Sequence, residues 1–149
     1  DQACFNKMIS LSDNACAESF LHAIGVSTLT SEANAIGLKN STFMKGGGPY
    51  TTANDQALLL GMIATGQNFS SANQQRLVEA MKKNVYRKGI PAGASGTVAD
   101  KVGFMNGLLH DSAIIYGSHG TYVLSIMTDG ASWEAIADLA KQLDALQAQ

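Results

Sequence analysis

The change of hydrophobic period near residue 97 is the feature that most constrains the fold of this chain. Before it, apolar residues recur at three- and four-residue spacings, which is typical of amphipathic helices. After it come three short runs rich in Val, Ile, Tyr and Phe, which predict strands over 97–104, 111–117 and 122–128. Asn106-Gly107 and Ser118-His119-Gly120 separate these runs and are typical of antiparallel hairpin turns. The pattern predicts an α+β fold, in which a helical region precedes a three-strand antiparallel meander.

Capping residues and glycines divide the remainder of the chain into helices. The pattern predicts helices over 14–23, within 28–36, from residue 52 to Gly66, over 71–85, and from Ser132 to the C-terminal region. Thr52-Ala-Asn-Asp55 has the form of a capping box with Asp in the Glu position. The segment 38–50 has no period and is predicted to be irregular, and Gly46-Gly47-Gly48 is interpreted as a turn rather than a phosphate-binding loop.

The size of the chain is that of one domain. Its 149 residues are 46% hydrophobic, enough for a sizeable core, so we interpret 1–149 as a single unit. Residues 1–89 form its helical part, and 90–149 form the strands and a closing helix. Ten basic and twelve acidic residues without a basic stripe argue against nucleic acid as a partner. No apolar run approaches the roughly 18 residues of a membrane span.

Two cysteines flank the polar tripeptide Ser12-Asp13-Asn14. If the flanking segments form a helical hairpin, Cys4 and Cys16 face each other and can form a disulfide, which is typical of an oxidising compartment. The alternative is that they are two small buried apolar residues. The three histidines are scattered and no Cys/His pair has ligand spacing, so no metal and no cofactor are expected.

Two short motifs carry the chemistry of the sequence. Ser12-Asp13-Asn14 has the residue types that cap a helix, and Asp13 is interpreted as the structural member that bonds the local backbone. Far downstream, Lys101-Val102-Gly103 lies in the first predicted strand. A lysine in a buried strand requires a partner, and the glycine leaves room for another backbone or a ligand to approach.

These motifs resemble the Ser-Asp-Asn and Lys-Thr-Gly elements of class A β-lactamases and related penicillin-binding peptidases. "MISLSDNACAESFLHAIG", "YTTANDQALLLGMIATG", "GIPAG" with "VADKVGF", and "HDSAIIY" with "YVLSIMT" are similar to successive segments of that family, in the same order. The resemblance spans nearly the whole chain. It implies a β-lactamase/D,D-peptidase-like fold, of which this chain is the C-terminal part, without the N-terminal strands and nucleophile helix.

The sequence departs from the family pattern at three points. No serine is followed by Lys three residues later, so the nucleophile of Ser-x-x-Lys is expected upstream of this chain, in a missing N-terminal segment of the same domain. Val102 stands where the family usually has a hydroxyl, which weakens recognition of a substrate carboxylate. No Glu occurs in 38–50 to drive hydrolysis of an acyl-enzyme, and the nearest acid is Glu32. Fast β-lactamase activity is therefore not expected.

The resemblance implies a role for each matching residue. Ser12 relays a proton, Lys101 adds positive potential and Asn14 contacts the acyl amide, so these three are the expected catalytic residues. Val102, Gly103 and Phe104 are the expected substrate-binding residues, which pair with substrate along a strand edge, and a backbone N–H within 104–106 serves the oxyanion hole.

The expected activity is serine hydrolase chemistry on β-lactams or D-Ala-D-Ala peptides of bacterial peptidoglycan, outside the cytoplasm: periplasmic, cell-surface or secreted. This chain alone lacks the nucleophile and is expected to be inactive. The alternative is a catalytically silent relative that binds cell wall or a protein partner. Tyr86 and Arg87 are interpreted either as contacts to such a ligand or as an exposed helix end, and a structural role is preferred for His110 and Asp111.

Overall fold

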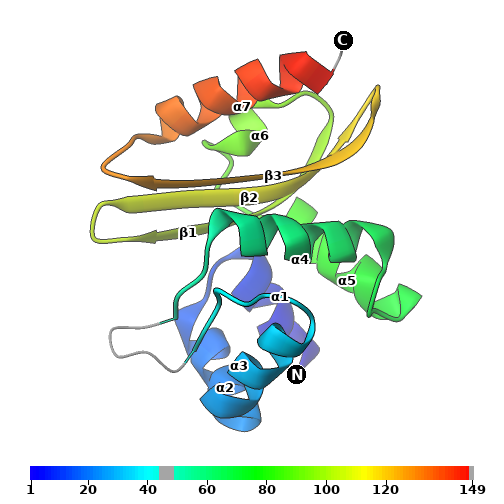
Figure 1. Ribbon diagram of the computed structural model, residues 1–149, viewed down its shortest axis with the longest axis vertical. Helices are drawn as coiled ribbons and strands as arrows, with labels where there is room; N and C mark the ends of the chain where they lie inside the picture. The colour runs from blue at the N-terminus through cyan, green and yellow to red at the C-terminus, as the bar shows by residue number, and fades with distance from the viewer. Residues whose placement is uncertain (44–48, 148–149) are drawn as a thin grey trace.

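The computed structural model describes residues 1–43 and 49–147, arranged as helices around one antiparallel sheet (Figure 1). The turn expected at 46–48 lies outside these residues. The elements in chain order are α1 (Gln2–Ser10), α2 (Asn14–Ile24), α3 (Val26–Ala35), α4 (Ala53–Thr65), α5 (Ser71–Lys82), α6 (Ile90–Gly93), β1 (Thr97–Met105), β2 (Leu108–Gly117), β3 (Gly120–Asp129) and α7 (Trp133–Gln147).

The sheet has the order β1-β2-β3 with both neighbours antiparallel, which confirms the predicted meander and the α+β class. Each strand extends one to three residues beyond a predicted end, because pairing continues up to the two-residue turns. Asn106 and Gly107 both have positive φ, at 51° and 85°, as a type I′ hairpin turn requires.

Helices cover both faces of the sheet, and each face has its own core (Figure 1). On one face, Ile136 and Ala140 of α7 pack with Ile90 and the sheet residues Val98 and Ile115. On the other face, the buried apolar residues of α4 and α5 pack on Ala99 and Ile114. Successive strand residues point to opposite faces. Even-numbered residues of β1 therefore face α6 and α7, and odd-numbered residues face α4, α5 and the first helices.

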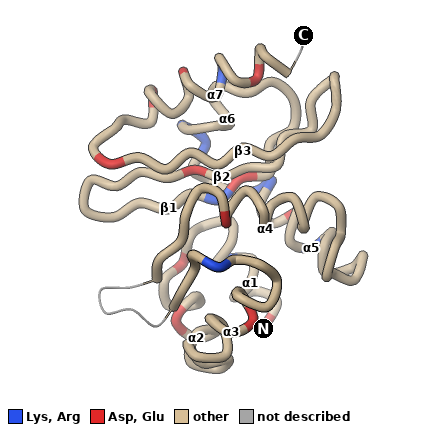
Figure 2. The backbone as a smooth tube through the Cα atoms, viewed as in Figure 1, with Lys and Arg blue, Asp and Glu red and all other residues tan. Residues whose placement is uncertain are grey.

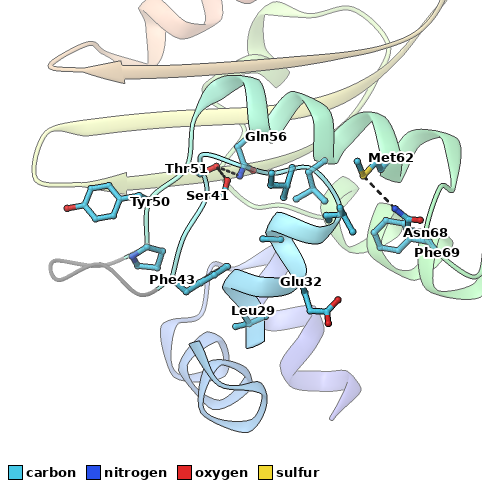
Figure 3. Close-up of a pocket in the computed structure, with 15 residues that line it drawn as sticks. Leu29, Glu32, Ser41, Phe43, Tyr50, Thr51, Gln56, Met62, Asn68 and Phe69 are labelled. Carbon is cyan, nitrogen blue, oxygen red and sulfur yellow. Dashed lines mark hydrogen bonds between the residues drawn. The ribbon is translucent and has the colours of Figure 1, made fainter. Parts of the chain in front are cut away.

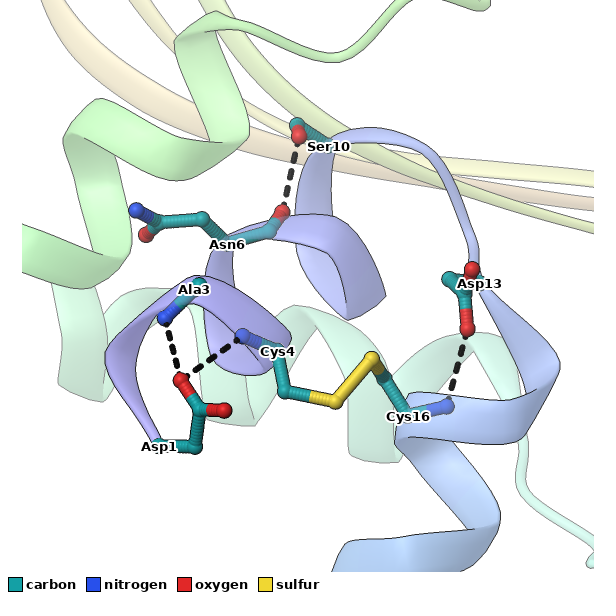
Figure 4. The surroundings of a disulfide bond; sticks show 7 residues. All are labelled: Asp1, Ala3, Cys4, Asn6, Ser10, Asp13 and Cys16. Atoms are coloured by element: carbon teal, nitrogen blue, oxygen red, sulfur yellow. Dashed lines mark hydrogen bonds between the residues drawn. A yellow bond between two sulfur atoms is a disulfide. The ribbon is translucent and has the colours of Figure 1, made fainter.

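The first two helices form a corner that is closed by a disulfide bond (Figure 4). Cys4 of α1 and Cys16 of α2 are joined, with their Cα atoms 5.2 Å apart. Asp13 caps α2 by accepting a 2.8 Å hydrogen bond from the Cys16 N–H. Asp1 caps α1 in the same way, by accepting from the Ala3 N–H.

Two helix predictions are corrected by the structure. Helix α5 ends at Lys82 rather than at residue 85, because the Asn84 side chain turns into the protein and bonds Asp100. The segment Ile90–Gly93 forms the short helix α6, which the sequence analysis did not predict; its proline occupies the first turn, where no N–H is needed. Among the described helices, none is long and apolar enough to cross a membrane. Figure 2 shows basic and acidic residues interspersed over the backbone.

The two edges of the sheet differ in how they are covered. The carbonyls of Val98 and Asp100 on β1 face away from β2 and accept hydrogen bonds from Arg87 and Asn84. In a strand, the backbone groups of alternate residues face the same edge. The backbone N–H and C=O groups of Val102 and Phe104 therefore also point away from β2, and they lie beyond the part of β1 that Arg87 and Asn84 cover. β3 forms the other edge of the sheet. Its outer side, which faces away from β2, has no strand partner among the described residues over its full length.

Candidate active site

A pocket of about 460 Å³ lies where the corner between α1 and α2 meets the open part of β1. Its lining includes both polar and apolar residues. The lining residues are Met8, Ser12, Asp13, Asn14, Ala17, Tyr86, Lys101, Val102, Gly103 and Phe104. We call this the site pocket. All six residues predicted to act in catalysis or substrate binding line it, although residues 14 and 101 are far apart in the sequence.

Ser12 is held at the bend between α1 and α2. Its φ of 55° lies in the left-handed region, which a residue with a side chain adopts at a cost that the surrounding structure must offset. The neighbouring Asp13 fixes the bend by capping α2 and by donating its backbone N–H to the Lys7 carbonyl at 3.3 Å. The strained backbone directs the half-buried Ser12 side chain toward β1, where it meets Lys101.

The Lys101 side chain points from β1 toward the face of the sheet that is covered by α4, α5 and the first helices. Its Nζ donates hydrogen bonds to Ser12 Oγ and, at 2.8 Å, to the Val102 carbonyl. Burial lowers the pKa of Lys101, whereas the carboxylates of Asp100 and Asp111 raise it, and the net shift is downward. A partly desolvated lysine next to a hydroxyl can take and return that hydroxyl's proton more readily than an exposed lysine.

Asp100, the residue before Lys101, anchors the strand from the other face of the sheet. It is fully buried and forms an ion pair with Arg87, and its second oxygen accepts a 2.6 Å hydrogen bond from Asn84 Nδ2. Burial raises the pKa of Asp100 to about 7, against the lowering effects of Arg87 and Asn84. Arg87 also donates to the Val98 carbonyl at 3.2 Å, so the loop 83–89 is clamped along β1.

Asp111 is a second buried carboxyl group, on β2 opposite Val102. One oxygen accepts a 2.8 Å hydrogen bond from the Ile90 N–H, and the other has no hydrogen-bond partner in the described part of the chain. Burial raises the pKa of Asp111 to about 7, and the nearby Asp100 charge raises it further. Asp100 has an arginine partner, whereas Asp111 forms no ion pair with any described residue.

The other predicted residues lie on α2 and on the open part of β1. Asn14 is exposed at the start of α2, and Gly103 and Phe104 are exposed on β1. Val102 is only 4% exposed, with its side chain on the face toward α7, so it presents its backbone rather than its side chain to the pocket. The carbonyl of Val102 already accepts a hydrogen bond from Lys101, whereas the outward N–H of Phe104 has no hydrogen-bond partner among the described residues.

Sequence reasoning left Tyr86 open between two interpretations, and it did not identify Met8 or Ala17. Tyr86 lies in a loop rather than at a helix end, and it lines the site pocket. Arg87, its neighbour, binds Asp100 instead and is structural. Met8 and Ala17 follow the helical spacing of α1 and α2, but spacing alone cannot distinguish a pocket lining from a core position.

Glu32 lies away from the site pocket. It is on α3 and lines a separate, largely apolar pocket of about 490 Å³ with Leu29, Phe43 and Phe69 (Figure 3). No carboxylate within the described residues of the 38–50 segment takes the place of the missing Glu. The described residues also contain no group of three or more His, Cys, Asp or Glu side chains that could hold a metal ion.

Comparisons with known proteins show the family and the fold of this chain. The chain belongs to the beta-lactamase enzyme family, whose model matches residues 2–147. No match was found among curated proteins. Among solved structures, PBP-A superposes with a TM-score of 0.88 at 21% identity, over 97% of this chain. A beta-lactamase from Sphaerobacter thermophilus gives 0.88 at 21% identity over 99% of this chain, and the putative class A beta-lactamase PenP from Rhodopseudomonas palustris gives 0.86 at 24% over 97%.

The chain is shorter than these neighbours. It covers 60% of the PBP-A chain, 62% of the Sphaerobacter chain and 64% of the Rhodopseudomonas chain. At these identities the likeness shows a common fold. The family is therefore that of serine beta-lactamase-like hydrolases, and the activity of the whole protein is a matter for proposal.

Proposed function

We propose that this chain supplies Ser12, Asn14 and Lys101 to a serine acyl-transfer enzyme that acts on D-Ala-D-Ala peptides or β-lactams. Its nucleophile belongs to a Ser-x-x-Lys segment outside residues 1–149. The observation that carries the proposal is the hydrogen bond between Ser12 and Lys101, which joins two distant motifs beside an open strand edge.

The roles follow from the chemistry of acyl transfer, which needs a deprotonated hydroxyl and a protonated leaving nitrogen. Ser12 Oγ, bonded to Lys101 Nζ, relays the proton from the nucleophile to the leaving nitrogen. Lys101 contributes positive potential for a substrate carboxylate. The edge at Val102–Phe104 binds the extended substrate by backbone hydrogen bonds, and the N–H of Phe104 is our choice for one oxyanion donor.

An apolar groove supports the proposal of a missing segment. It has a volume of about 660 Å³, and its lining includes Phe5, Phe20, Leu21 and Ile24. It shares Met8, Asn14 and Ala17 with the site pocket, so the two are continuous. A segment that buries apolar side chains in this groove has one end beside Ser12, where a nucleophile is needed.

Slow deacylation is part of the proposal, because Glu32 lies in a different pocket. A structural neighbour offers a parallel: a PBP-A mutant has been solved as an acyl-enzyme complex with penicillin G, with a TM-score of 0.87 to this chain and 21% identity. The disulfide between Cys4 and Cys16 supports a location outside the cytoplasm, since structural disulfides persist in oxidising compartments.

Val102 favours a second candidate, a catalytically silent relative that binds cell wall or a protein partner. Its buried aliphatic side chain cannot donate a hydrogen bond to a substrate carboxylate, so anion recognition at this edge depends on Lys101. Weak recognition of the carboxylate is tolerable in a binding protein, whereas it slows an enzyme.

The test is the intact mass of the natural full-length protein after exposure to penicillin G. We expect a stable adduct on a serine outside residues 1–149, with little loss of free drug. Loss of the drug without an adduct supports acyl transfer with fast turnover and contradicts the slow step. Neither adduct nor loss of the drug overturns the enzyme and favours the binding protein.

A further inference from the structure

Two aromatic rings in the lining of the site pocket have no role in the proposed chemistry, which uses only the backbone of Phe104. Tyr86 and Phe104 line the pocket, with ring centroids 5.2 Å apart at an interplanar angle of 62°. Phe104 in turn meets Trp133 at the start of α7, at 6.2 Å and 83°. Tyr86 is 37% exposed and Phe104 is 48% exposed. We call the rings of Tyr86 and Phe104 the aromatic wall.

The aromatic wall is held in place from behind. The Tyr86 N–H donates to Asn84 Oδ1 at 3.0 Å, and the next residue, Arg87, is paired with the buried Asp100. Trp133 packs against the core cluster that includes Ile90 and Ile136. A ligand that binds to these rings therefore has little protein motion to restrain, which favours affinity.

The position of the wall identifies which part of a substrate it meets. The N–H of Val85 donates to the Ser10 carbonyl at 3.0 Å, so the loop that carries Tyr86 runs beside the bend that carries Ser12. Ser12 is assigned to the leaving nitrogen and Lys101 to the carboxylate of the leaving group, whereas Asn14 is assigned to the acyl amide. The wall therefore lies on the leaving-group side of the site.

The orientation of Phe104 determines which substrate side chain can reach the aromatic wall. Phe104 points toward α7 while Lys101 points toward Ser12, because neighbouring strand residues face opposite sides. A strand that pairs with this edge places its alternate side chains on the two faces, and the one opposite Phe104 meets the rings. Half-exposed aromatic rings gain free energy when an apolar group covers them.

We propose that Tyr86 and Phe104 are specificity-determining residues, which select a substrate whose leaving group carries an aromatic or large apolar side chain. This inference rests on the proposed function. The preference concerns the leaving group only, because the acyl part of the substrate lies at the side of the pocket that carries Asn14.

The test compares two peptides, N-acetyl-D-Ala-D-Phe and N-acetyl-D-Ala-D-Ala, as competitors of acylation by penicillin G in the natural full-length protein. We expect the D-Phe peptide to inhibit about tenfold more strongly, the effect of one aromatic contact. Tyr86→Ser is expected to weaken inhibition by the D-Phe peptide far more than inhibition by the D-Ala peptide, so that the preference is lost, and Tyr86→Phe is expected to retain it. Val85→Ser is the matched control, because Val85 is 58% exposed in the same loop and lies outside the pocket lining.

Three results overturn the inference: equal inhibition by the two peptides, no inhibition by either while penicillin still acylates, or equal weakening of both by Tyr86→Ser. If Tyr86→Ser does not fold, Phe104→Leu tests the same wall from β1. Failure of the proposed function is distinguishable, because the wild-type protein then gives no reaction with penicillin at all.

Discussion

At the scale of single residues, the pair Ser12 and Lys101 determines what the site can do. Each belongs to a motif that is weak alone, and the structure joins them by one hydrogen bond at the end of an open strand edge. Ser12 adopts a left-handed backbone conformation to reach Lys101. A backbone conformation of this kind persists only where the surrounding structure holds it in place.

We predict that Ser12→Ala slows acylation of the full-length protein by penicillin G about 100-fold or more, the usual contribution of a positioned proton-transfer group. The rate is measured by stopped-flow or by quenched intact-mass sampling. Because Ala also tolerates less of the left-handed region than Gly, Ser12→Gly is the matched control for the backbone. An unchanged acylation rate in both variants removes Ser12 from the mechanism.

Asp111 makes a pH-dependent contribution to stability. Its pKa is raised to about 7 in the folded protein, above the unfolded value near 3.8, so the folded state holds the proton more tightly. The stability it contributes is therefore complete below about pH 4 and is lost as the pH rises through 7. We predict that Asp111→Asn, which does not titrate, gains on the order of 2 kcal/mol relative to wild type between pH 5 and pH 8.

Urea unfolding of both proteins at the two pH values measures this difference. Asp144→Asn is the control: hydrogen bonds from Ser95 and Tyr122 lower the pKa of Asp144, so it is ionised at both pH values. The relative stability of Asp144→Asn should not change between them. The same stability difference for Asp111→Asn at pH 5 and pH 8 contradicts the assignment.

At the scale of helices and strands, the packing of α6 on α7 depends on one residue without a side chain. A Cβ atom at Gly93 would lie 1.9 Å from the Ala137 carbonyl oxygen and 2.9 Å from the Lys141 nitrogen. A Cβ atom at Gly61 of α4 would have no atom within 4 Å. Both glycines are helical, so they form a matched pair.

We predict that Gly93→Ala destabilises the protein by about 1 to 3 kcal/mol or more, the cost of overpacking. Gly61→Ala should instead stabilise it by up to about 1 kcal/mol, because alanine has the higher helix propensity. Thermal and urea unfolding compare the two variants with wild type. Equal effects of both substitutions are incompatible with close packing of α6 against α7.

The disulfide ties α1 to α2 across the bend that carries Ser12. Cys4 and Cys16 are separated by 12 positions, and closing a loop of that size is worth about 3 kcal/mol. We predict this loss of unfolding free energy in the double variant Cys4→Ser/Cys16→Ser, measured by urea titration. Reduction of the wild-type protein should give the same loss. Equal stability of the reduced and oxidised proteins contradicts a bond in the folded state.

The elements were largely predictable from the sequence, whereas their long-range partners were not. Thr52 caps α4 and Asn106-Gly107 makes a hairpin turn because both signals are local. The inward turn of Asn84, the aromatic wall and the orphaned oxygen of Asp111 depend on loops that pack across β1. The site pocket was anticipated through motif resemblance. Tyr86 lines the site pocket because of the path of its loop, which hydrophobic periodicity cannot predict.

At the scale of the whole molecule, two largely apolar pockets lie side by side on the surface of the described residues. The apolar groove and the pocket drawn in Figure 3 share Leu29, Phe43 and Pro49, so they form one continuous surface that leads to the site pocket. Large exposed apolar surfaces on an isolated chain attract other apolar groups. The surface is consistent with the chain's coverage of about three fifths of the PBP-A length.

We predict that residues 1–149 alone bind a hydrophobic dye such as ANS or self-associate, whereas the natural full-length protein does neither. Fluorescence titration and analytical ultracentrifugation measure the two properties. A monomeric 1–149 chain without dye binding would count against the missing segment. The same dye binding by the full-length protein would show that the groove stays open.

The free edge of β3 has a consequence for how such a chain fares in a cell. The open part of β1 is short, because the loop 83–89 covers the rest. The outer edge of β3, which faces away from β2, has no strand partner in the described structure along Gly120–Asp129. A long unpaired edge is a template for another strand, including the same strand of a second molecule. On their own, residues 1–149 are therefore expected to associate through this edge, strand against strand.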